Sequence, residues 1–232
     1  MQIKYNRSQR RCPIKYIVVH DTGNTGKGAD AMAHFNYFNS ENRGASADIF
    51  VDDNVCLKVN DYNKYYTWHC GDGNGINGIT NSNSVGIEIC VNSDGDYNLA
   101  FLKAAELVKK LMKELCIPLE NVVRHFDAGR KNCPSSMSAD NWALWKKFKN
   151  IISESGELTV TQYEELKKEI DVLKSQQETI YHYGSTIPQW AAPTMQKLID
   201  KGYYKGENDG DLNLPESLMR VLVINDRAGL YD

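Results

Sequence analysis

Two potential metal ligands, His125 and Cys133, lie close together in the segment that runs from Val123 to Pro134. Zinc binds imidazole nitrogen and thiolate sulfur together, and a catalytic zinc uses three protein ligands and leaves a fourth position for water or substrate. The best candidate for the third ligand is His20, which ends an apolar run that is typical of a buried strand. These residues can form one site only if their two strands lie near each other in one sheet, which strongly constrains the fold.

The same residues have an ordinary interpretation. The histidines could be hydrogen-bonded residues of the core and Cys133 an inert buried thiol. The spacing does not decide between the two interpretations. If the site exists, two neutral imidazoles and one thiolate leave the metal with net positive charge, which polarises a carbonyl group and lowers the pKa of bound water.

Hydrolysis at such a site also requires a group that moves a proton. Glu88 is the candidate, because it is a carboxylate inside the apolar strand predicted over 85–91. Lys131, two residues before Cys133, could supply positive charge to a developing oxyanion. Each has a plain alternative: an isolated glutamate in a strand is often a solvated residue on the exposed face, and a loop lysine is often a surface residue.

Hydrophobic periodicity predicts the order of the elements in the first part of the chain. Strands are predicted over 14–20, 49–51, 55–59, 85–91 and 122–123, the second and third forming a hairpin. Helices are predicted from about Asp30, from about 98 to 116 and from about 140 to 152. A glycine-rich loop over 68–84 is expected at the lip of a cleft. Together these elements predict a first domain over residues 1–153.

The composition changes after Gly156. Apolar residues recur at heptad spacing over 160–180, with Glu and Lys between them, which predicts a helical linker over 154–184. The seam is shorter than three full repeats, so two interpretations stay open: pairing in a homodimer, or packing against the neighbouring domain. A small helical domain is predicted over 185–232, where five Lys or Arg and seven Asp or Glu give no support for binding polyanions by bulk charge.

Charge and hydropathy exclude several classes of partner. The formal net charge of −3 gives no electrostatic support for binding nucleic acid or an acidic membrane. The apolar runs are too short to predict insertion into a membrane. The basic N-terminus is not followed by an apolar core, so it does not resemble a secretory signal peptide. We therefore expect synthesis in the cytoplasm, where most of the six cysteines would be free thiols.

Five segments of the chain, in this order, resemble the type 2 N-acetylmuramoyl-L-alanine amidases, which are relatives of peptidoglycan recognition proteins. The resemblance covers about residues 12–152. It implies an α/β fold with a mixed β-sheet flanked by helices, and hydrolysis of the amide between the lactyl group of N-acetylmuramic acid and L-alanine. The five segments contain His20, Ser46–Asp52, Trp68–His69, Asn83–Glu88 and Arg124–Pro134.

The resemblance also implies roles for individual residues. Glu88 becomes the acid/base and Lys131 the stabiliser of the oxyanion. Trp68 and His69 would line the substrate cleft. The cofactor would be zinc, and its ligands would be His20, His125 and Cys133.

The chain departs from the family at two neighbouring positions. Members that use a tyrosine near the metal have it where this chain has Ala47, and others have a histidine where it has Asp48. The missing tyrosine strengthens the assignment of Glu88. Asp48 is retained as a candidate substrate-binding residue.

The C-terminal residues 185–232 resemble, more loosely, one S-layer-homology-like repeat of the kind found in clostridial phage lysins. The two resemblances imply a phage or prophage endolysin that acts on the peptidoglycan of a Gram-positive, clostridial cell wall after release from the cytoplasm. A lone repeat buries little surface, so a homodimer through residues 160–180 would increase avidity. The alternatives are a non-catalytic peptidoglycan-binding protein, a bacterial autolysin and a muropeptide-recycling amidase.

Overall fold

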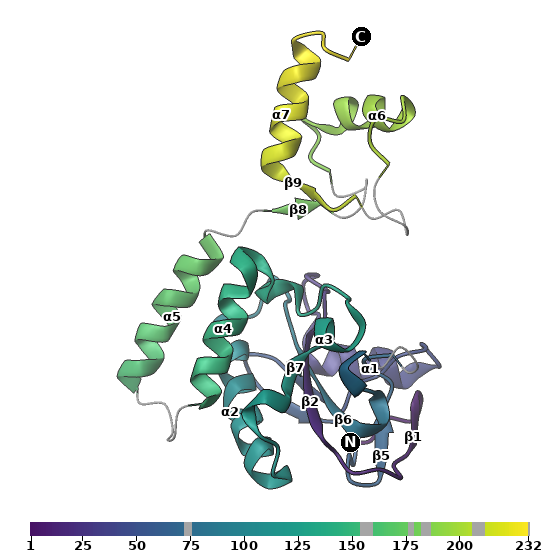
Figure 1. The fold of residues 1–232 in the computed structure, drawn as a ribbon, viewed down its shortest axis with the longest axis vertical. Helices are drawn as coiled ribbons and strands as arrows, with labels where there is room; N and C mark the ends of the chain where they lie inside the picture. Colours follow the sequence, from purple (N-terminus) through teal and green to yellow (C-terminus); the bar gives the residue numbers. More distant parts are fainter. Residues whose placement is uncertain (72–75, 154–159, 176–178, 182–186, 206–211, 232) are drawn as a thin grey trace. The chain divides into compact units, whose positions relative to one another are not determined.

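The computed structural model describes residues 1–232 except 72–75, 154–159, 176–178, 182–186, 206–211 and 232, and except the side chains of 160–163 and 175 (Figure 1). The chain forms two compact units, Met1–Ser175 and Gln176–Asp232. Every helix in the described ranges is too short or too polar to cross a membrane.

A five-stranded sheet with the order β4-β3-β6-β2-β7 forms the centre of the first unit. Strands β3, β6, β2 and β7 are parallel, and β4 is antiparallel to β3, which confirms the predicted mixed sheet and hairpin. Strand β2 lies between β6 and β7, so the strands that carry His20, Glu88 and the start of the His125 segment are neighbours. The bounds are Tyr16–Asp21 for β2, Ile49–Val51 for β3, Cys56–Lys58 for β4, Ser84–Ile89 for β6 and Val122–Arg124 for β7.

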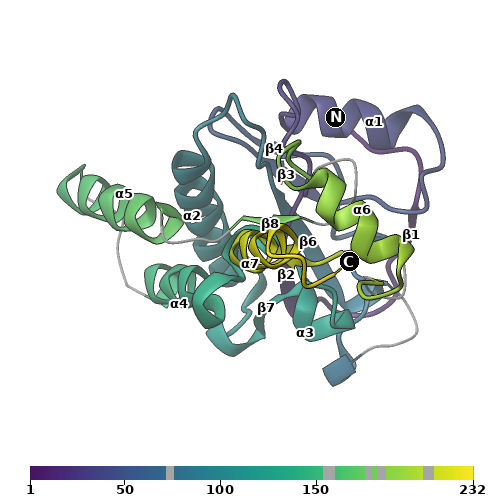
Figure 2. The same cartoon turned by 90° about the horizontal axis from the view of Figure 1, so that it is seen from above.

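Helices cover both faces of this sheet, as predicted (Figure 2). Helices α2, Tyr97–Leu115, and α4, Ala139–Ser153, pack against one face through residues such as Phe101 and Phe148, both fully buried. Helix α1, Ala31–Ser40, packs against the other face around Phe50. Helices α1 and α2 begin at aspartate caps: the side chain of Asp30 accepts a hydrogen bond from the backbone N–H of Ala33, and that of Asp96 accepts one from the backbone N–H of Leu99.

Several short elements have no strong periodicity and were not predicted. Strands β1, Arg7–Gln9, and β5, Tyr65–Thr67, form a separate antiparallel pair. Short 3-10 helices η1 to η4 cover Ile76–Gly78, Asn81–Asn83, Leu119–Asn121 and Ser135–Met137. The segment after β7, predicted to be a loop, begins with helix α3, His125–Gly129.

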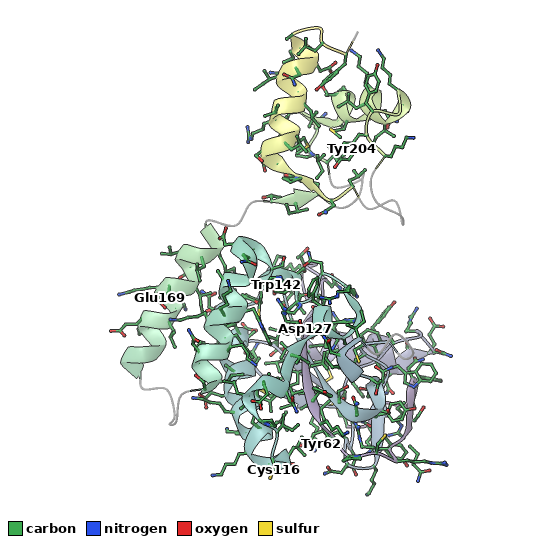
Figure 3. All side chains as sticks on the ribbon, in the orientation of Figure 1. Tyr62, Cys116, Asp127, Trp142, Glu169 and Tyr204 are labelled. Atoms are coloured by element: carbon green, nitrogen blue, oxygen red, sulfur yellow. The ribbon has the colours of Figure 1, made fainter. Side chains whose placement is uncertain are left out.

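Helix α3 is stabilised by Arg124, the last residue of β7. Its guanidinium pairs with the carboxylate of Asp127 at 2.7 Å and lies 4.1 Å from the ring centroid of Trp142. Figure 3 labels these two partners, Asp127 on α3 and Trp142 on α4. The carboxylate of Asp127 also accepts a hydrogen bond from the backbone N–H of Arg124, as a cap does. This local pairing ends β7 and starts the helix that carries His125.

Helix α5, Val160–Ser175, packs against α2 and α4 of its own chain. Ile170 on the predicted seam is fully buried, and Leu166 and Leu173 pack against the same core. Of the two interpretations, the structure therefore agrees with the one in which the helix packs against the neighbouring domain. The first compact unit extends to Ser175, whereas the predicted boundary is at 153. Among the described seam residues, Leu166, Ile170 and Leu173 pack against the core of their own chain.

The second unit is small and has its own core. It contains β8, Ile180–Tyr181, α6, Ala192–Asp200, β9, Leu214–Pro215, and α7, Glu216–Arg227. A small helical domain is predicted here, and helices α6 and α7 are present. Met195 of α6 and Met219 of α7 are fully buried, and Lys197 forms an ion pair of 2.8 Å with Asp226 between the helices.

Candidate metal centre

The strand order brings the three predicted ligands together. His20 lies near the end of β2, His125 begins α3 directly after β7, and Cys133 lies in the following turn. Their ligand atoms lie within 4.8 Å of one another, and Nδ1 of His20 is 3.7 Å from Sγ of Cys133. A tetrahedral ion with bonds of about 2.0–2.3 Å would hold neighbouring ligand atoms roughly 3.3–3.8 Å apart. The distance between His20 and Cys133 falls in this range, and the separation of up to 4.8 Å within the set is close enough for the three side chains to converge on one ion after small rotations.

The free nitrogen atoms also fit a metal. Nδ1 of His125 is buried and has no hydrogen-bond partner among the described residues. Buried polar atoms are nearly always hydrogen-bonded, and a bond to a metal would satisfy this one. For His20, Nε2 is already hydrogen-bonded to Nδ1 of His69 at 3.0 Å, which leaves Nδ1 for a metal.

The protonation states suit metal binding. Burial lowers the pKa of His125 to about 4, with a further contribution from Lys131. Burial also lowers the pKa of His20 well below its ordinary value, and neighbouring His125 adds to the effect. Neutral imidazole is the form that binds metal. Burial raises the pKa of the Cys133 thiol, so this ligand would release a proton on binding.

Glu88 points into the site and is not a solvated residue. It pairs in register with His20 between β6 and β2, and its Oε1 lies 3.9 Å from Nδ1 of His20. The side chain is 18% exposed, and its Oε2 is buried without a hydrogen-bond partner in the described structure. Burial and the nearby Asp21 raise the pKa of Glu88 to about 8, while Lys131 opposes the shift. This carboxyl group is therefore able to exchange a proton near neutral pH.

Lys131 is exposed, two residues before Cys133. Its positive charge contributes to the lowered pKa of both His20 and His125. Trp68 has 39% of its surface exposed, and its indole N–H donates to Oγ of Ser8 at 3.2 Å. Both side chains are therefore accessible to solvent.

The structure does not place the other two predicted substrate residues in a cleft. His69 is 8% exposed and lies behind His20. Asp48 is fully buried, where its carboxylate accepts hydrogen bonds from the backbone N–H of Gly86 at 2.8 Å and from Nδ2 of Asn60 at 2.6 Å. Asp48 thus ties β6 to the neighbouring segments and has no surface to offer a substrate.

Asp21 is a site residue that sequence reasoning missed. Its carboxylate accepts hydrogen bonds from the backbone N–H of Ser136 at 2.6 Å and from Oγ of Ser135 at 3.1 Å. These bonds hold the turn that follows Cys133 against the end of β2. The only signal in the sequence is its position next to His20, which says nothing about a partner more than a hundred residues away.

A cavity of about 500 Å³ lies between α1 and the loop that follows β2. Thr22, two residues after His20 in the sequence, is one of the lining residues, and its hydroxyl oxygen is buried and has no hydrogen-bond partner among the described residues. Other lining residues include Asn24, Lys27, His34 and Tyr37. The cavity therefore offers polar groups close to the candidate metal centre.

Comparison with known proteins gives consistent results. Residues 10–136 match the family model described as N-acetylmuramoyl-L-alanine amidase. The chain is 43% identical over 143 residues to the N-acetylmuramoyl-L-alanine amidase CwlH of Bacillus subtilis, covering 60% of this chain and 53% of the relative. It is 31% identical over 238 residues to the N-acetylmuramoyl-L-alanine amidase CwlA of a Bacillus species, covering 99% of this chain and 85% of the relative.

A solved structure supports the same assignment. The structure of a mutant endolysin from Bacillus subtilis aligns with a TM-score of 0.57 and 37% identity, covering 65% of this chain and 99% of that one. The chain spans about half the length of two curated relatives, 53% of CwlH and 42% of the N-acetylmuramoyl-L-alanine amidase XlyA of Bacillus subtilis.

Proposed function

The chain belongs to the N-acetylmuramoyl-L-alanine amidase family, and on this premise we propose that it is a zinc-dependent peptidoglycan hydrolase. In this proposal it cleaves the amide between the lactyl group of N-acetylmuramic acid and L-alanine. One observation carries the proposal: the ligand atoms of His20, His125 and Cys133 converge within 4.8 Å, with the carboxylate of Glu88 3.9 Å from His20.

The residues of the site divide the work of amide hydrolysis. Zinc, when bound by the three ligands, would polarise the substrate carbonyl and lower the pKa of water. Glu88 takes a proton from the attacking water and returns it to the leaving nitrogen, a task suited to its position 3.9 Å from the ligand atom of His20. The ammonium group of Lys131 stabilises the negative charge that develops on the carbonyl oxygen.

The surroundings suggest where the two parts of the substrate bind. The exposed indole of Trp68 offers a flat apolar surface on which a sugar ring can pack. The cavity beside α1 is lined by polar residues such as Asn24 and Lys27, which suit a polar or acidic peptide. We therefore assign the glycan side of the substrate to Trp68 and the stem peptide to the cavity.

We further propose that the protein acts as a phage or prophage endolysin on a Gram-positive, clostridial cell wall. It would be made in the cytoplasm and reach the wall once the membrane is breached. The second unit would bind the wall, and its exposed apolar residues on α7, Leu218, Val221 and Ile224, support a binding role. A homodimer through residues 160–180 is not part of the proposal, because Ile170 of that seam is buried within one chain.

The test uses the purified full-length chain and intact clostridial cell walls. We expect release of new L-alanine amino termini with zinc, loss of release after chelation, and recovery when zinc is restored. A non-catalytic binding protein would sediment with the walls and release nothing. A recycling amidase would act only on soluble muropeptides, and either result would contradict the endolysin proposal.

A further inference from the structure

We propose that His69 is a positioning residue that fixes the tautomer of His20 through a directional chain of hydrogen bonds from His20 through His69 and Ser84 to the carbonyl of Thr80. This inference rests on the proposed function, because it concerns the same metal site. It gives His69 a role behind the metal ligand in place of a role in the substrate cleft.

The hydrogen bond from Ser84 to the carbonyl of Thr80 sets the donor–acceptor direction of the whole series of hydrogen bonds. Oγ of Ser84 lies 2.5 Å from the carbonyl oxygen of Thr80. A carbonyl oxygen only accepts, so the single hydroxyl hydrogen of Ser84 must point at Thr80. Oγ of Ser84 is then an acceptor for Nε2 of His69, 3.1 Å away, and this nitrogen must carry the ring proton of His69.

The same logic continues to the metal ligand. A neutral imidazole carries one N–H, so Nδ1 of His69 is an acceptor. It lies 3.0 Å from Nε2 of His20, which must therefore donate. The proton of His20 is held on Nε2, and Nδ1 keeps its lone pair on the side where Sγ of Cys133 lies 3.7 Å away. This is the tautomer that a metal bound at Nδ1 requires.

The surrounding residues hold the ring of His69 in one position. A Cβ atom on Gly86 would lie 2.5 Å from the ring of His69, so a side chain at position 86 would displace it. The backbone N–H groups of His69 and Cys70 both donate to Oδ1 of Asn81, at 2.9 and 2.8 Å. The ring of His69 is thus held against Gly86 of β6, and the backbone of His69 is held by the side chain of Asn81.

The chemical consequence is that His20 is held in the tautomer that binds metal before the metal arrives. Without an acceptor at Nδ1 of His69, His20 would divide between its two tautomers, and the one with a proton on Nδ1 cannot bind a metal there. Residues that hydrogen-bond the second nitrogen of a metal-bound histidine typically change metal affinity by about 10–100-fold. We expect an effect of this size from His69.

The first test uses the unmodified, metal-free protein. Long-range proton–nitrogen NMR spectra of the histidine rings distinguish the two tautomers. We expect the proton of both His20 and His69 on Nε2. A proton on Nδ1 of His20 would overturn the proposal, whether or not the protein proves to be an amidase.

The second test measures zinc affinity by competition with a chelator in full-length variants. We expect His69→Phe, which keeps the ring shape without an acceptor, to weaken zinc binding about 10–100-fold, and His69→Asn, which can still accept from His20, to recover part of the loss. Ser84→Ala should weaken binding less than His69→Phe. Ser82→Ala is the matched control, because its hydroxyl contacts the side chain of Thr80, at 3.0 Å, and makes no hydrogen bond to His69 or Ser84 in the described structure; it should bind zinc as the wild type does.

The outcomes separate the two proposals. A wild-type protein that binds no zinc contradicts the proposed function. A wild type that binds zinc, together with a folded His69→Phe variant of equal affinity, contradicts only the role of His69.

Discussion

Glu88 and His20 are paired in register on neighbouring parallel strands, and the carboxylate of Glu88 lies 3.9 Å from Nδ1 of His20. Side chains alternate along a strand, so both residues point to the same face of the sheet. This is the face covered by α1 and α3 (Figure 2). In the sequence, Glu88 looks like an ordinary polar residue within an apolar strand. The strand pairing places it in the candidate metal centre.

Replacing this carboxylate should stop catalysis without removing the metal. We expect Glu88→Gln to lower kcat by about 10²–10⁴-fold, because the amide cannot transfer the proton. Zinc content should stay the same, since Glu88 is not a ligand. Release of L-alanine amino termini and metal analysis of the same sample check this. The exposed Glu41→Gln serves as a control, and full activity of Glu88→Gln would show that another group moves the proton.

Glu88 should also make the metal-free protein less stable at alkaline pH. Burial raises its pKa from 4.5 to about 8, so between these values the folded chain keeps a proton that the unfolded chain has lost. Stability therefore falls as the pH rises from about 4.5, and the full cost is present above pH 8. We expect Glu88→Gln to raise the free energy of unfolding by about 1–3 kcal/mol at pH 9 and to change it little at pH 4.

Denaturant titration of chelator-treated samples at the two pH values measures this difference. A stabilisation by Glu88→Gln that is the same at both pH values would mean that ionisation of Glu88 is not its cause.

Removing the thiolate should remove the metal. Cys133→Ser leaves two imidazoles and a poor ligand, so we expect the variant to lose zinc on dialysis and to lose activity with it. Metal analysis after dialysis gives the result. Cys56→Ser, at an exposed cysteine far from the ligands in the sequence, should keep one zinc per chain. Retention of zinc by Cys133→Ser would contradict the ligand set.

The charge of Lys131 should matter for turnover more than for binding. We expect Lys131→Met to lower kcat by about 10²-fold, the size typical for loss of one group that stabilises an oxyanion. Lys131→Arg keeps the charge and should retain part of the activity. Steady-state kinetics on a soluble muropeptide separates kcat from KM. Unchanged kcat in Lys131→Met would leave Lys131 as a surface residue.

Helix α5 should be part of the first folding unit. Ile170 is fully buried against the core, whereas Val172, two residues later on the same helix, is 55% exposed. We expect Ile170→Ala to cost about 2–4 kcal/mol of stability and Val172→Ala less than about 0.5 kcal/mol. Sedimentation should show a monomer at micromolar concentration. A dimer that Ile170→Ala dissociates without loss of stability would contradict this packing.

The main elements of the first unit follow from local patterns in the sequence. The apolar stripe of α2 and the apolar run of β2 each reflect one period of hydrophobic residues, and such periods depend on neighbours along the chain. Helix α3 and the β1–β5 pair were not predictable in this way. The first depends on the pairing of Arg124 with Asp127 and Trp142, and the second on pairing between segments about sixty residues apart.

The sequence by itself determined which groups can do the chemistry: two histidines, a cysteine, a glutamate and a lysine of the right types. Their convergence depended on strand order, which places β2 between β6 and β7. Only the tertiary structure decided that His69 lies behind His20, that Asp48 is buried and that α5 covers its own seam. The physical reason is that these outcomes depend on contacts between distant segments, such as the 49 residues that separate His20 from His69.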